Sequence, residues 1–423
     1  MLEEFIIQGN TKLKGSIHIS GAKNSVLKLL TACILTDQPM TLLNVPNVSD
    51  VYSMLQLLEV LGASAQFVDD KINIVIPQII SEIAPYDFVR KMRASLGVLG
   101  PLLARHGKAV VSLPGGCTLG ARAIDIHLNS LAAMGADIHL ENGYIHAKGH
   151  LKGATLNFHF PSMGATENVM MAATLAKGTT IIHNAAREPE IVDLANMLCQ
   201  MGAQIQGQGT STLEIQGVDQ LHGTKYKTLS DRLETATYAM AALITEGEID
   251  LYNTKKEFLA DIETYIKGAI IKDCGDYVKV SGKIEDVANI TTAPFPGYPT
   301  DLQAPTMTLL TQAPGMSTIH EALFENRFTH VPELARMGAK IEIKDRTAYI
   351  YGKTPLYGAP VMATDLRAGV ALVMAALIAE GETCIKRIYH IDRGYSHLVE
   401  KLTSCGANIK RVPQEPHQME QLA

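Results

Sequence analysis

The motif MGADIHL, at Met134–Leu140, is a short repeated phrase with six related copies along the chain of 423 residues. The other copies are LGASAQF from Leu61, MGAQIQG from Met201, KGAIIKD from Lys267, MGAKIEI from Met337 and CGANIKR from Cys405. Successive copies begin 66 to 73 residues apart. Such regular self-similarity outranks local signals when an architecture is assigned. The sequence therefore predicts six related units.

Each copy of the phrase predicts the end of a helix and the start of a strand. Apolar residues at helical spacing precede it, as in SMLQLLEVLG. Glycine then ends the helix because it readily adopts the left-handed conformation. The residues that follow alternate apolar and polar, as in a half-buried strand. A second helix, for example over 165–176 or 368–379, leads into a further strand-rich run.

These elements predict an α/β fold of two domains, each with three units packed around helices that are apolar on most faces. The fourth unit departs from the pattern. There Lys267 replaces the apolar residue before glycine, and the segment that follows is compressed. Tryptophan is absent and aromatic residues make up only 5% of the chain, so we expect an aliphatic core.

The composition excludes several classes of protein. Hydrophobic residues at 47% and charged residues at 19% are typical of a globular chain. A net charge of −6 without a basic tract argues against a nucleic-acid partner. No apolar stretch approaches the roughly 20 residues of a membrane span, and the acidic N-terminus MLEEFIIQGN does not resemble a signal peptide. We therefore expect a cytoplasmic protein with no membrane partner.

Cysteine and histidine spacing gives no sign of a metal site. The six cysteines lie far apart without a CxxC pair, which argues against both zinc and a disulfide scaffold. The 14 histidines include no HExxH motif. The sequence implies no metal and no cofactor.

A glycine-rich turn, SLPGGCTLGARAIDIH over 112–127, is the first candidate for chemistry. Its backbone can approach a ligand closely. Cys117 lies at its centre, and free backbone N–H groups together with Arg122 would stabilise a thiolate there. Cys117 is thus a candidate acid or nucleophile. The alternative is an inert thiol packed as a small hydrophobe.

A second candidate is ISGAKNSVLKLLTACIL, which begins at Ile19. The pattern puts Lys23 and Asn24 in the first turn of a long apolar helix. A lysine is electrostatically unfavourable there unless an anion neutralises it. The Walker pattern GxxxxGK[ST] is absent, so a nucleotide P-loop is not indicated. A solvated lysine is the alternative.

Arginines and one aspartate complete the set of candidates. The arginines lie in contexts that are not simple solvent faces: Arg93, Arg122, Arg232, Arg327, Arg367 and Arg393. Together they would suit a doubly charged anion through forked hydrogen bonds. Asp301, in FPGYPTDLQAP, is either a helix N-cap or a general base or anchor for substrate hydroxyls.

The combination of motifs closely resembles the UDP-N-acetylglucosamine 1-carboxyvinyltransferase family of enolpyruvyl transferases. The motifs that carry the resemblance are ISGAKNSVLKLL, KMRASLGVLGPLLAR, LPGGCTLGAR, AAREPEIVDLANML, YPTDLQA, FENRFTHVPELARMGA, ATDLRAG and RIYHIDRGY. The match extends from about Phe5 to Val412. It implies an inside-out α/β barrel of six repeats, three per domain, with the active site in the cleft between the domains. One domain would comprise 22–230 and carry the cysteine loop; the other would comprise 1–21 with 231–423.

The resemblance also implies the reaction. The 3′-hydroxyl of UDP-N-acetylglucosamine would add to C2 of phosphoenolpyruvate while C3 is protonated, and phosphate would then leave the tetrahedral ketal. Cys117 looks like the proton donor and the residue that fosfomycin alkylates in this family. Asp301 looks like the base. The residues implied for phosphoenolpyruvate are Lys23, Asn24, Arg122, Arg327, Arg367 and Arg393, of which Lys23 and Arg393 also count as catalytic.

The nucleotide sugar would be bound by a second set of residues. They are Arg93, Arg122, Ala123, Ile124, Asp125, Ile126, His127, Ser162, Met163, Gly164, Asp301 and Leu323. The chain departs from the family pattern in two places: Ala123 stands where proline is usual, and Phe160 where some members have lysine. We expect altered affinity for the nucleotide sugar and unaltered chemistry.

Other readings of the sequence remain. Enolpyruvylshikimate phosphate synthase shares the fold, but it lacks the cysteine loop and has a different N-terminal lysine motif. RNA terminal phosphate cyclase, a more distant relative, would need a basic face. A non-catalytic paralogue that binds UDP-N-acetylglucosamine and regulates the pathway is the alternative of a different class. The sequence leaves the oligomeric state open.

Overall fold

The computed structural model describes residues 2–89, 92–113 and 124–414, and its chain divides into two compact units. Unit I consists of Ser20–Ser230 with Pro294–Gly297. Unit II consists of Met1–Ile19, Asp231–Ala293 and Tyr298–Ala423. The fold is mixed α/β, as the sequence predicts, and each unit has its own hydrophobic core.

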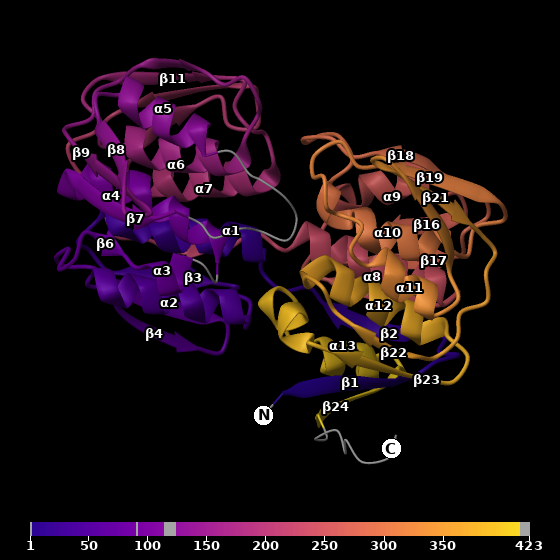
Figure 1. The fold of residues 1–423 in the computed structure, drawn as a ribbon. Helices are drawn as coiled ribbons and strands as arrows, with labels where there is room; N and C mark the ends of the chain where they lie inside the picture. The colour runs from indigo at the N-terminus through magenta and orange to yellow at the C-terminus, as the bar shows by residue number, and fades with distance from the viewer. Residues whose placement is uncertain (1, 90–91, 114–123, 415–423) are drawn as a thin grey trace, which may run out of the picture. The chain divides into compact units, whose positions relative to one another are not determined.

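Among the described residues, unit I contains three four-stranded sheets (Figure 1). The first has the order β14 (Lys225–Lys227), β3 (Met40–Leu43), β5 (Lys71–Val75), β4 (Ser64–Val68). The second is β6 (Ile83–Ala84), β7 (Lys108–Ser112), β9 (Tyr144–Lys148), β8 (Asp137–Glu141). The third is β10 (Thr155–Asn157), β11 (Thr179–His183), β13 (Thr212–Gln216), β12 (Gln204–Gln206).

The described part of unit II also contains three four-stranded sheets. The first is β2 (Lys14–His18), β15 (Glu248–Tyr252), β17 (Tyr277–Gly282), β16 (Ala269–Asp273). The second is β18 (Asn289–Thr291), β19 (Met316–His320), β21 (Thr347–Tyr351), β20 (Lys340–Lys344). The third is β22 (Pro360–Met362), β23 (Glu382–Lys386), β1 (Glu3–Gln8), β24 (Asn408–Pro413).

All six sheets share one pairing pattern. The first two strands of each order given above are parallel, and the next two pairings are antiparallel. A parallel pair needs a crossover connection, whereas a hairpin joins antiparallel strands. In unit II, β1 from the N-terminus lies between two strands from the C-terminal part of the chain, so both ends of the sequence contribute to one sheet.

Each unit also contains α-helices and short 3₁₀ turns. In unit I they are α1 (Lys23–Ala32), α2 (Ser49–Leu61), α3 (Tyr86–Val89), α4 (Leu99–His106), α5 (Asp125–Ala133), α6 (Met163–Ala173) and α7 (Pro189–Gln200), with the 3₁₀ turns η1 (Cys33–Leu35) and η2 (Arg93–Val98). In unit II they are α8 (Arg232–Ile244), α9 (Ala260–Tyr265), α10 (Gln303–Leu310), α11 (Val331–Arg336), α12 (Leu366–Ile378) and α13 (Leu398–Ser404), with η3 (Lys256–Leu259), η4 (Thr300–Leu302) and η5 (Ile388–Arg393).

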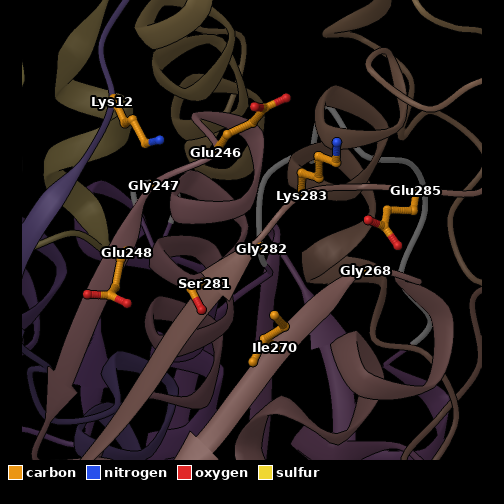
Figure 2. Close-up of a pocket in the computed structure, with 10 residues that line it drawn as sticks. All are labelled: Lys12, Glu246, Gly247, Glu248, Gly268, Ile270, Ser281, Gly282, Lys283 and Glu285. Carbon is orange, nitrogen blue, oxygen red and sulfur yellow. The ribbon is translucent and has the colours of Figure 1, made fainter.

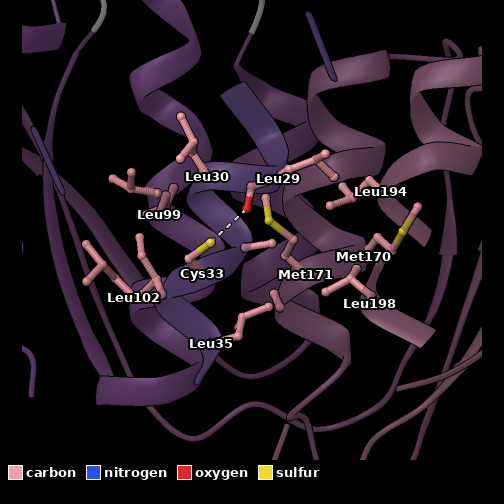
Figure 3. Close-up of a cluster of buried hydrophobic side chains, with 14 of the residues drawn as sticks. Leu29, Leu30, Cys33, Leu35, Leu99, Leu102, Met170, Met171, Leu194 and Leu198 are labelled. Carbon is pink, nitrogen blue, oxygen red and sulfur yellow. Dashed lines mark hydrogen bonds between the residues drawn. The ribbon is translucent and has the colours of Figure 1, made fainter. Parts of the chain in front are cut away.

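The most buried helices are enclosed by the protein on nearly all faces. Every residue of α10 and every residue of α8 after Arg232 is buried, and α8, α10 and α12 pack against one another (Figure 1). In unit I, aliphatic and methionine side chains from α1, α4, α6 and α7 fill the core (Figure 3). Cys33 belongs to this core, where its thiol donates to the Leu29 carbonyl at 3.3 Å. The expected aliphatic core is confirmed.

The glycine of each repeated phrase has the predicted left-handed conformation. The φ angles are 118° at Gly62, 100° at Gly135, 104° at Gly202, 88° at Gly268, 99° at Gly338 and 94° at Gly406. Each glycine follows a helix and precedes a strand. The fourth copy departs as expected: α9 ends at Tyr265, three residues before its glycine, whereas the other helices end one or two residues before theirs.

No helix in the described part of the chain is long and apolar enough to cross a membrane. The longest, α2, α8 and α12, have 13 residues each.

Candidate active site

Asp301 lies at the centre of a charge cluster in unit II. Its Oδ1 accepts a hydrogen bond from Arg327 Nη2 at 2.7 Å. Its Oδ2 accepts from Arg367 Nη2 at 3.1 Å and from Arg367 Nε at 3.3 Å. The Arg327 and Arg367 side chains are only 4% and 5% exposed, whereas that of Asp301 is 30% exposed. Two buried cations thus hold a carboxylate that keeps one edge accessible.

The prediction that Asp301 is a helix N-cap residue is wrong. Asp301 lies inside η4, and the N-cap residue of α10 is Leu302, which makes no side-chain cap bond. Its carboxylate is engaged by the two arginines instead. An aspartate N-cap would accept from backbone N–H groups of its own helix, as Asp365 does at the start of α12.

Arg367 is fixed on several sides. Asp365 caps the backbone N–H of Arg367 at 2.8 Å, and the Arg367 Nη1 group donates to the Tyr395 hydroxyl at 3.0 Å. Burial alone would lower the pKa of Arg367, but Tyr395, Asp301 and Asp231 raise it above its ordinary value. The guanidinium therefore stays charged at the pH of any enzymatic assay.

Arg393 ends η5, a turn that is held by close packing and by an ion pair. The neighbouring Asp392 accepts two hydrogen bonds from Arg411 of β24, at 2.9 and 2.8 Å. A Cβ atom on Gly394 would come within 2.6 Å of the Leu366 side chain, so a larger residue there would require that side chain to shift. The structure therefore brings Arg393 and Arg367 onto two elements that pack together.

Leu323 lies on a loop organised by Glu321, a residue that the sequence analysis missed. Glu321 is fully buried, and its Oε1 accepts from the backbone N–H groups of Leu323 and Phe324 at 2.9 and 3.1 Å. Its Oε2 accepts from Thr300, the residue before Asp301, at 2.8 Å. One buried carboxylate thus fixes both the Leu323 backbone and the turn that carries Asp301.

Lys23 and Asn24 begin α1 in unit I, as predicted. The helix has no side-chain cap and no acidic residue in its first turn. Lys23 Nζ lies 2.8 Å from Asp50 Oδ2 in the first turn of α2, and the Asp50 side chain is only 4% exposed. The alternative of a solvated lysine is therefore wrong. The anion that accompanies Lys23 in the structure is a carboxylate of the protein, and sequence spacing gave no signal for that pairing.

The predicted nucleotide-sugar residues of unit I fall into two neighbouring helix starts. Ile124 precedes α5, which begins with Asp125, Ile126 and His127. Ser162 caps α6, accepting from the backbone N–H of Ala165 at 3.3 Å, and Met163 and Gly164 follow it. The two helix starts come together at the buried His127 ring. Asn168 Nδ2 of α6 lies 3.0 Å from His127 Nδ1, and a Cβ atom on Gly164 would lie 3.4 Å from His127 Cε1 and Nε2.

Several predicted residues cannot be placed. Cys117, Arg122 and Ala123 fall within 114–123, outside the described residues. Arg93 begins η2, but its side chain is likewise outside the description. Phe160, the other departure from the family pattern, is 42% exposed just before Ser162.

The described residues show no candidate metal centre, and a surface hollow on unit II lies apart from the predicted site residues. Among 2–89, 92–113 and 124–414, no group of three or more His, Cys, Asp and Glu side chains could hold a metal ion. An open hollow of about 390 Å³ lies on unit II beside β15, β16 and β17. It is lined by glycines and by charges of both signs, including Lys12, Glu248 and Lys283 (Figure 2). It contains none of the predicted site residues.

Comparison with known proteins gives the family. The family model described as EPSP synthase (3-phosphoshikimate 1-carboxyvinyltransferase) matches residues 7–402. The UDP-N-acetylglucosamine 1-carboxyvinyltransferase of Dinoroseobacter shibae is 51% identical, with 97% of this chain and 99% of the relative covered. The enzyme of the same name from Ruegeria pomeroyi is 52% identical, with 97% of this chain and 100% of the relative covered.

Solved structures show the same fold at lower sequence identity. The enolpyruvyl transferase NikO from Streptomyces tendae superposes with a TM-score of 0.86 at 24% identity, covering 97% of this chain and 99% of its own. EPSP synthase from Acinetobacter baumannii superposes with a TM-score of 0.72 at 18% identity, covering 97% of this chain and 100% of its own. The predicted resemblance is confirmed. The chain belongs to the EPSP synthase family, in the group of the UDP-N-acetylglucosamine 1-carboxyvinyltransferases.

Proposed function

We propose that this protein is a transferase that moves the enolpyruvyl group of phosphoenolpyruvate to the 3′-hydroxyl of UDP-N-acetylglucosamine and releases phosphate. This would be the first committed step of peptidoglycan synthesis, and it would take place in the cytoplasm. The observation that carries the proposal is identity of 51% and 52%, over 97% of the chain, to relatives named for this activity. The Asp301 cluster and the paired Lys23 support it, because both provide charges suited to the reaction.

The architecture fits the same proposal. The six sheets are taken as six copies of one repeat, three in each unit, arranged as an inside-out α/β barrel. The two units then correspond to the domains 22–230 and 1–21 with 231–423. Because the predicted residues divide between the units, both would act on the same substrates.

Asp301 is the base in this reaction. It takes the proton of the sugar 3′-hydroxyl while that oxygen bonds to C2 of phosphoenolpyruvate. Cys117 gives a proton to C3 in the same addition, and phosphate then leaves the tetrahedral ketal with loss of a C3 proton. The buried Arg327 and Arg367 support this role because their hydrogen bonds orient the Asp301 carboxylate while 30% of that side chain stays exposed.

The cations bind the phosphate and carboxylate of phosphoenolpyruvate. Lys23 can do so without giving up Asp50, because an ammonium group has three N–H donors. Asn24, Arg122 and Arg393, with Arg327 and Arg367, complete the set. Fixed cations stabilise the charge that develops as phosphate leaves, and the reaction needs neither a metal nor a cofactor.

The nucleotide sugar binds along Arg93, the segment 122–127, Ser162 to Gly164 and Leu323. The hydrogen bond between Asn168 of α6 and the His127 ring of α5 supports a shared role for the two helix starts of unit I. Alanine at 123 and phenylalanine at 160 remove a rigid turn residue and a possible cation, so affinity for the nucleotide sugar should differ from that of other family members.

Phosphate release tests the proposal. Purified protein is mixed with phosphoenolpyruvate and either UDP-N-acetylglucosamine or shikimate 3-phosphate, with and without fosfomycin preincubation. We expect release with the nucleotide sugar only, abolished by fosfomycin. Release that resists fosfomycin would remove Cys117 from its role. Binding of UDP-N-acetylglucosamine without phosphate release would favour the non-catalytic paralogue and overturn the proposal.

A further inference from the structure

The Tyr395 hydroxyl lies in a buried hydrogen-bonded chain that ends on Arg367. Arg367 Nη1 lies 3.0 Å from the Tyr395 oxygen, which lies 2.9 Å from Thr237 Oγ1. The three residues are 4%, 3% and 1% exposed. Tyr395 follows η5 and Thr237 lies in α8, so the chain joins two elements to the start of α12.

The direction of each hydrogen bond can be assigned. Thr237 Oγ1 also lies 2.7 Å from the Leu233 carbonyl, which can only accept. The single hydroxyl proton of Thr237 therefore goes to Leu233, and its oxygen accepts from the Tyr395 hydroxyl. Tyr395 in turn has a lone pair left for the Arg367 Nη1–H group. The hydrogen bonds thus run from the Arg367 guanidinium through the two hydroxyl groups to the Leu233 carbonyl, and each donor has one acceptor.

This arrangement sets the orientation of Arg367. A guanidinium is planar and rigid, so a bond at Nη1 on one edge determines where Nε and Nη2 point on the other. In the structure those two nitrogens face Asp301 Oδ2. Without the Tyr395 oxygen, a buried N–H group would lose its acceptor, and Arg367 would turn to recover one.

We propose that Tyr395 is a positioning residue of the reaction: through its hydroxyl it holds Arg367 in the orientation that aims the Asp301 carboxylate. The inference rests on the proposed role of Asp301 as the base. Tyr395 itself contacts no substrate. Its effect falls on the transition state, in which the direction of the carboxylate matters most, more than on ground-state binding.

The test is the Tyr395→Phe variant, which removes one oxygen and keeps the ring. We expect kcat to fall about tenfold and KM for UDP-N-acetylglucosamine to change less than twofold. KM for phosphoenolpyruvate should rise, because Arg367 is also assigned to that substrate. Thr237→Val, which removes the acceptor of the Tyr395 proton, should lower kcat in the same sense. Thr237→Ser, which keeps the hydroxyl, should have a kcat close to that of wild type.

Tyr298→Phe is the matched control. Tyr298 is also a buried tyrosine of unit II, and its hydroxyl bonds to Thr306. We expect a similar fall in melting temperature for Tyr298→Phe and Tyr395→Phe, but a fall in kcat for Tyr395→Phe only. Equal kcat values for Tyr395→Phe and wild type, or equal losses in both tyrosine variants, would overturn the proposal.

A crystal structure of Tyr395→Phe separates this proposal from the assigned reaction. We expect the Arg367 Nε and Nη2 contacts with Asp301 to be broken or lengthened, a result that needs no activity. If the wild type releases no phosphate, the proposed function fails while this readout still applies. If Arg367 keeps its place beside Asp301 in the variant, the positioning role of Tyr395 fails even where the reaction is established.

Discussion

The Asp301 carboxylate pairs with two buried cations that would otherwise repel each other. Arg327 and Arg367 both lie on its carboxylate, and neither side chain is more than 5% exposed. Burying a charge is costly unless it is paired, so Asp301 stabilises the cluster in addition to its proposed role as the base. Changes at this single residue should therefore affect both activity and stability.

Asp301→Asn separates these two effects. The amide cannot act as a base at neutral pH, so we expect kcat to fall by at least about 100-fold. It also removes the charge that pairs the arginines, so the melting temperature should fall. Steady-state phosphate release and calorimetric titration of UDP-N-acetylglucosamine would be compared with wild type. A variant that folds, binds the nucleotide sugar and retains more than about a tenth of wild-type kcat would exclude the assignment.

Residues of this site differ in how far the sequence could locate them. Lys23 and Asn24 were placed at a helix start because their neighbours in the chain already carry the helical pattern. Asp50, Glu321 and Tyr395 were missed. Each makes a decisive contact with a residue from another element, as Glu321 does with Thr300, and no local pattern encodes such a pairing. Asp301 and the arginines were candidates from their sequence contexts, and the family motifs gave their roles, but neither gave the hydrogen bonds that orient them.

At the scale of elements, the repeated phrase works through backbone geometry. Every glycine of the six phrases has φ between 88° and 118°, a range that residues with a Cβ rarely adopt. This is why the helix ends and strand starts could be predicted from the sequence alone. The pairing of strands from distant parts of a unit could not be predicted, because the alternation of apolar and polar residues within one strand does not identify the strand with which it pairs. The β1 strand between β23 and β24 is an example.

Two glycines of unit I allow the backbone cost to be separated from packing. A Cβ on Gly135 would meet ordinary contacts, the nearest 3.6 Å away, whereas one on Gly62 would lie 2.4 Å from the Gln78 carbonyl. Gly135→Ala should cost about 1 kcal/mol of unfolding free energy from the strained φ alone. Gly62→Ala should cost more, because the backbone must also move. Urea denaturation of both variants checks the order, and equal losses would contradict it.

At the scale of the whole molecule, some ionisable side chains are buried beside the two hydrophobic cores. Glu167 of α6 is 1% exposed, and its Oε2 lies 3.2 Å from Lys28 Nζ of α1. Burial raises the pKa of Glu167 to about 7, against the lowering effect of Lys28 and with a further rise from Glu188 and Glu190. The composition predicted an aliphatic core, but not that a carboxyl group would be enclosed in it.

This buried group should make the stability of the protein depend on pH. In the unfolded chain Glu167 loses its proton near pH 4.5, whereas in the native state it keeps it to about pH 7. Between these values the native state binds more protons, so stability falls as pH rises, by up to about 1.4 kcal/mol per pH unit. Glu167→Gln removes this contribution. Its melting temperature relative to wild type should therefore increase from pH 4.5 to 7 and level off outside that range.

Glu59→Gln, at an exposed position of α2 in the same unit, controls for the loss of one charge and should show no such trend. A constant difference between Glu167→Gln and wild type across the range would mean that Glu167 is ionised in the native core.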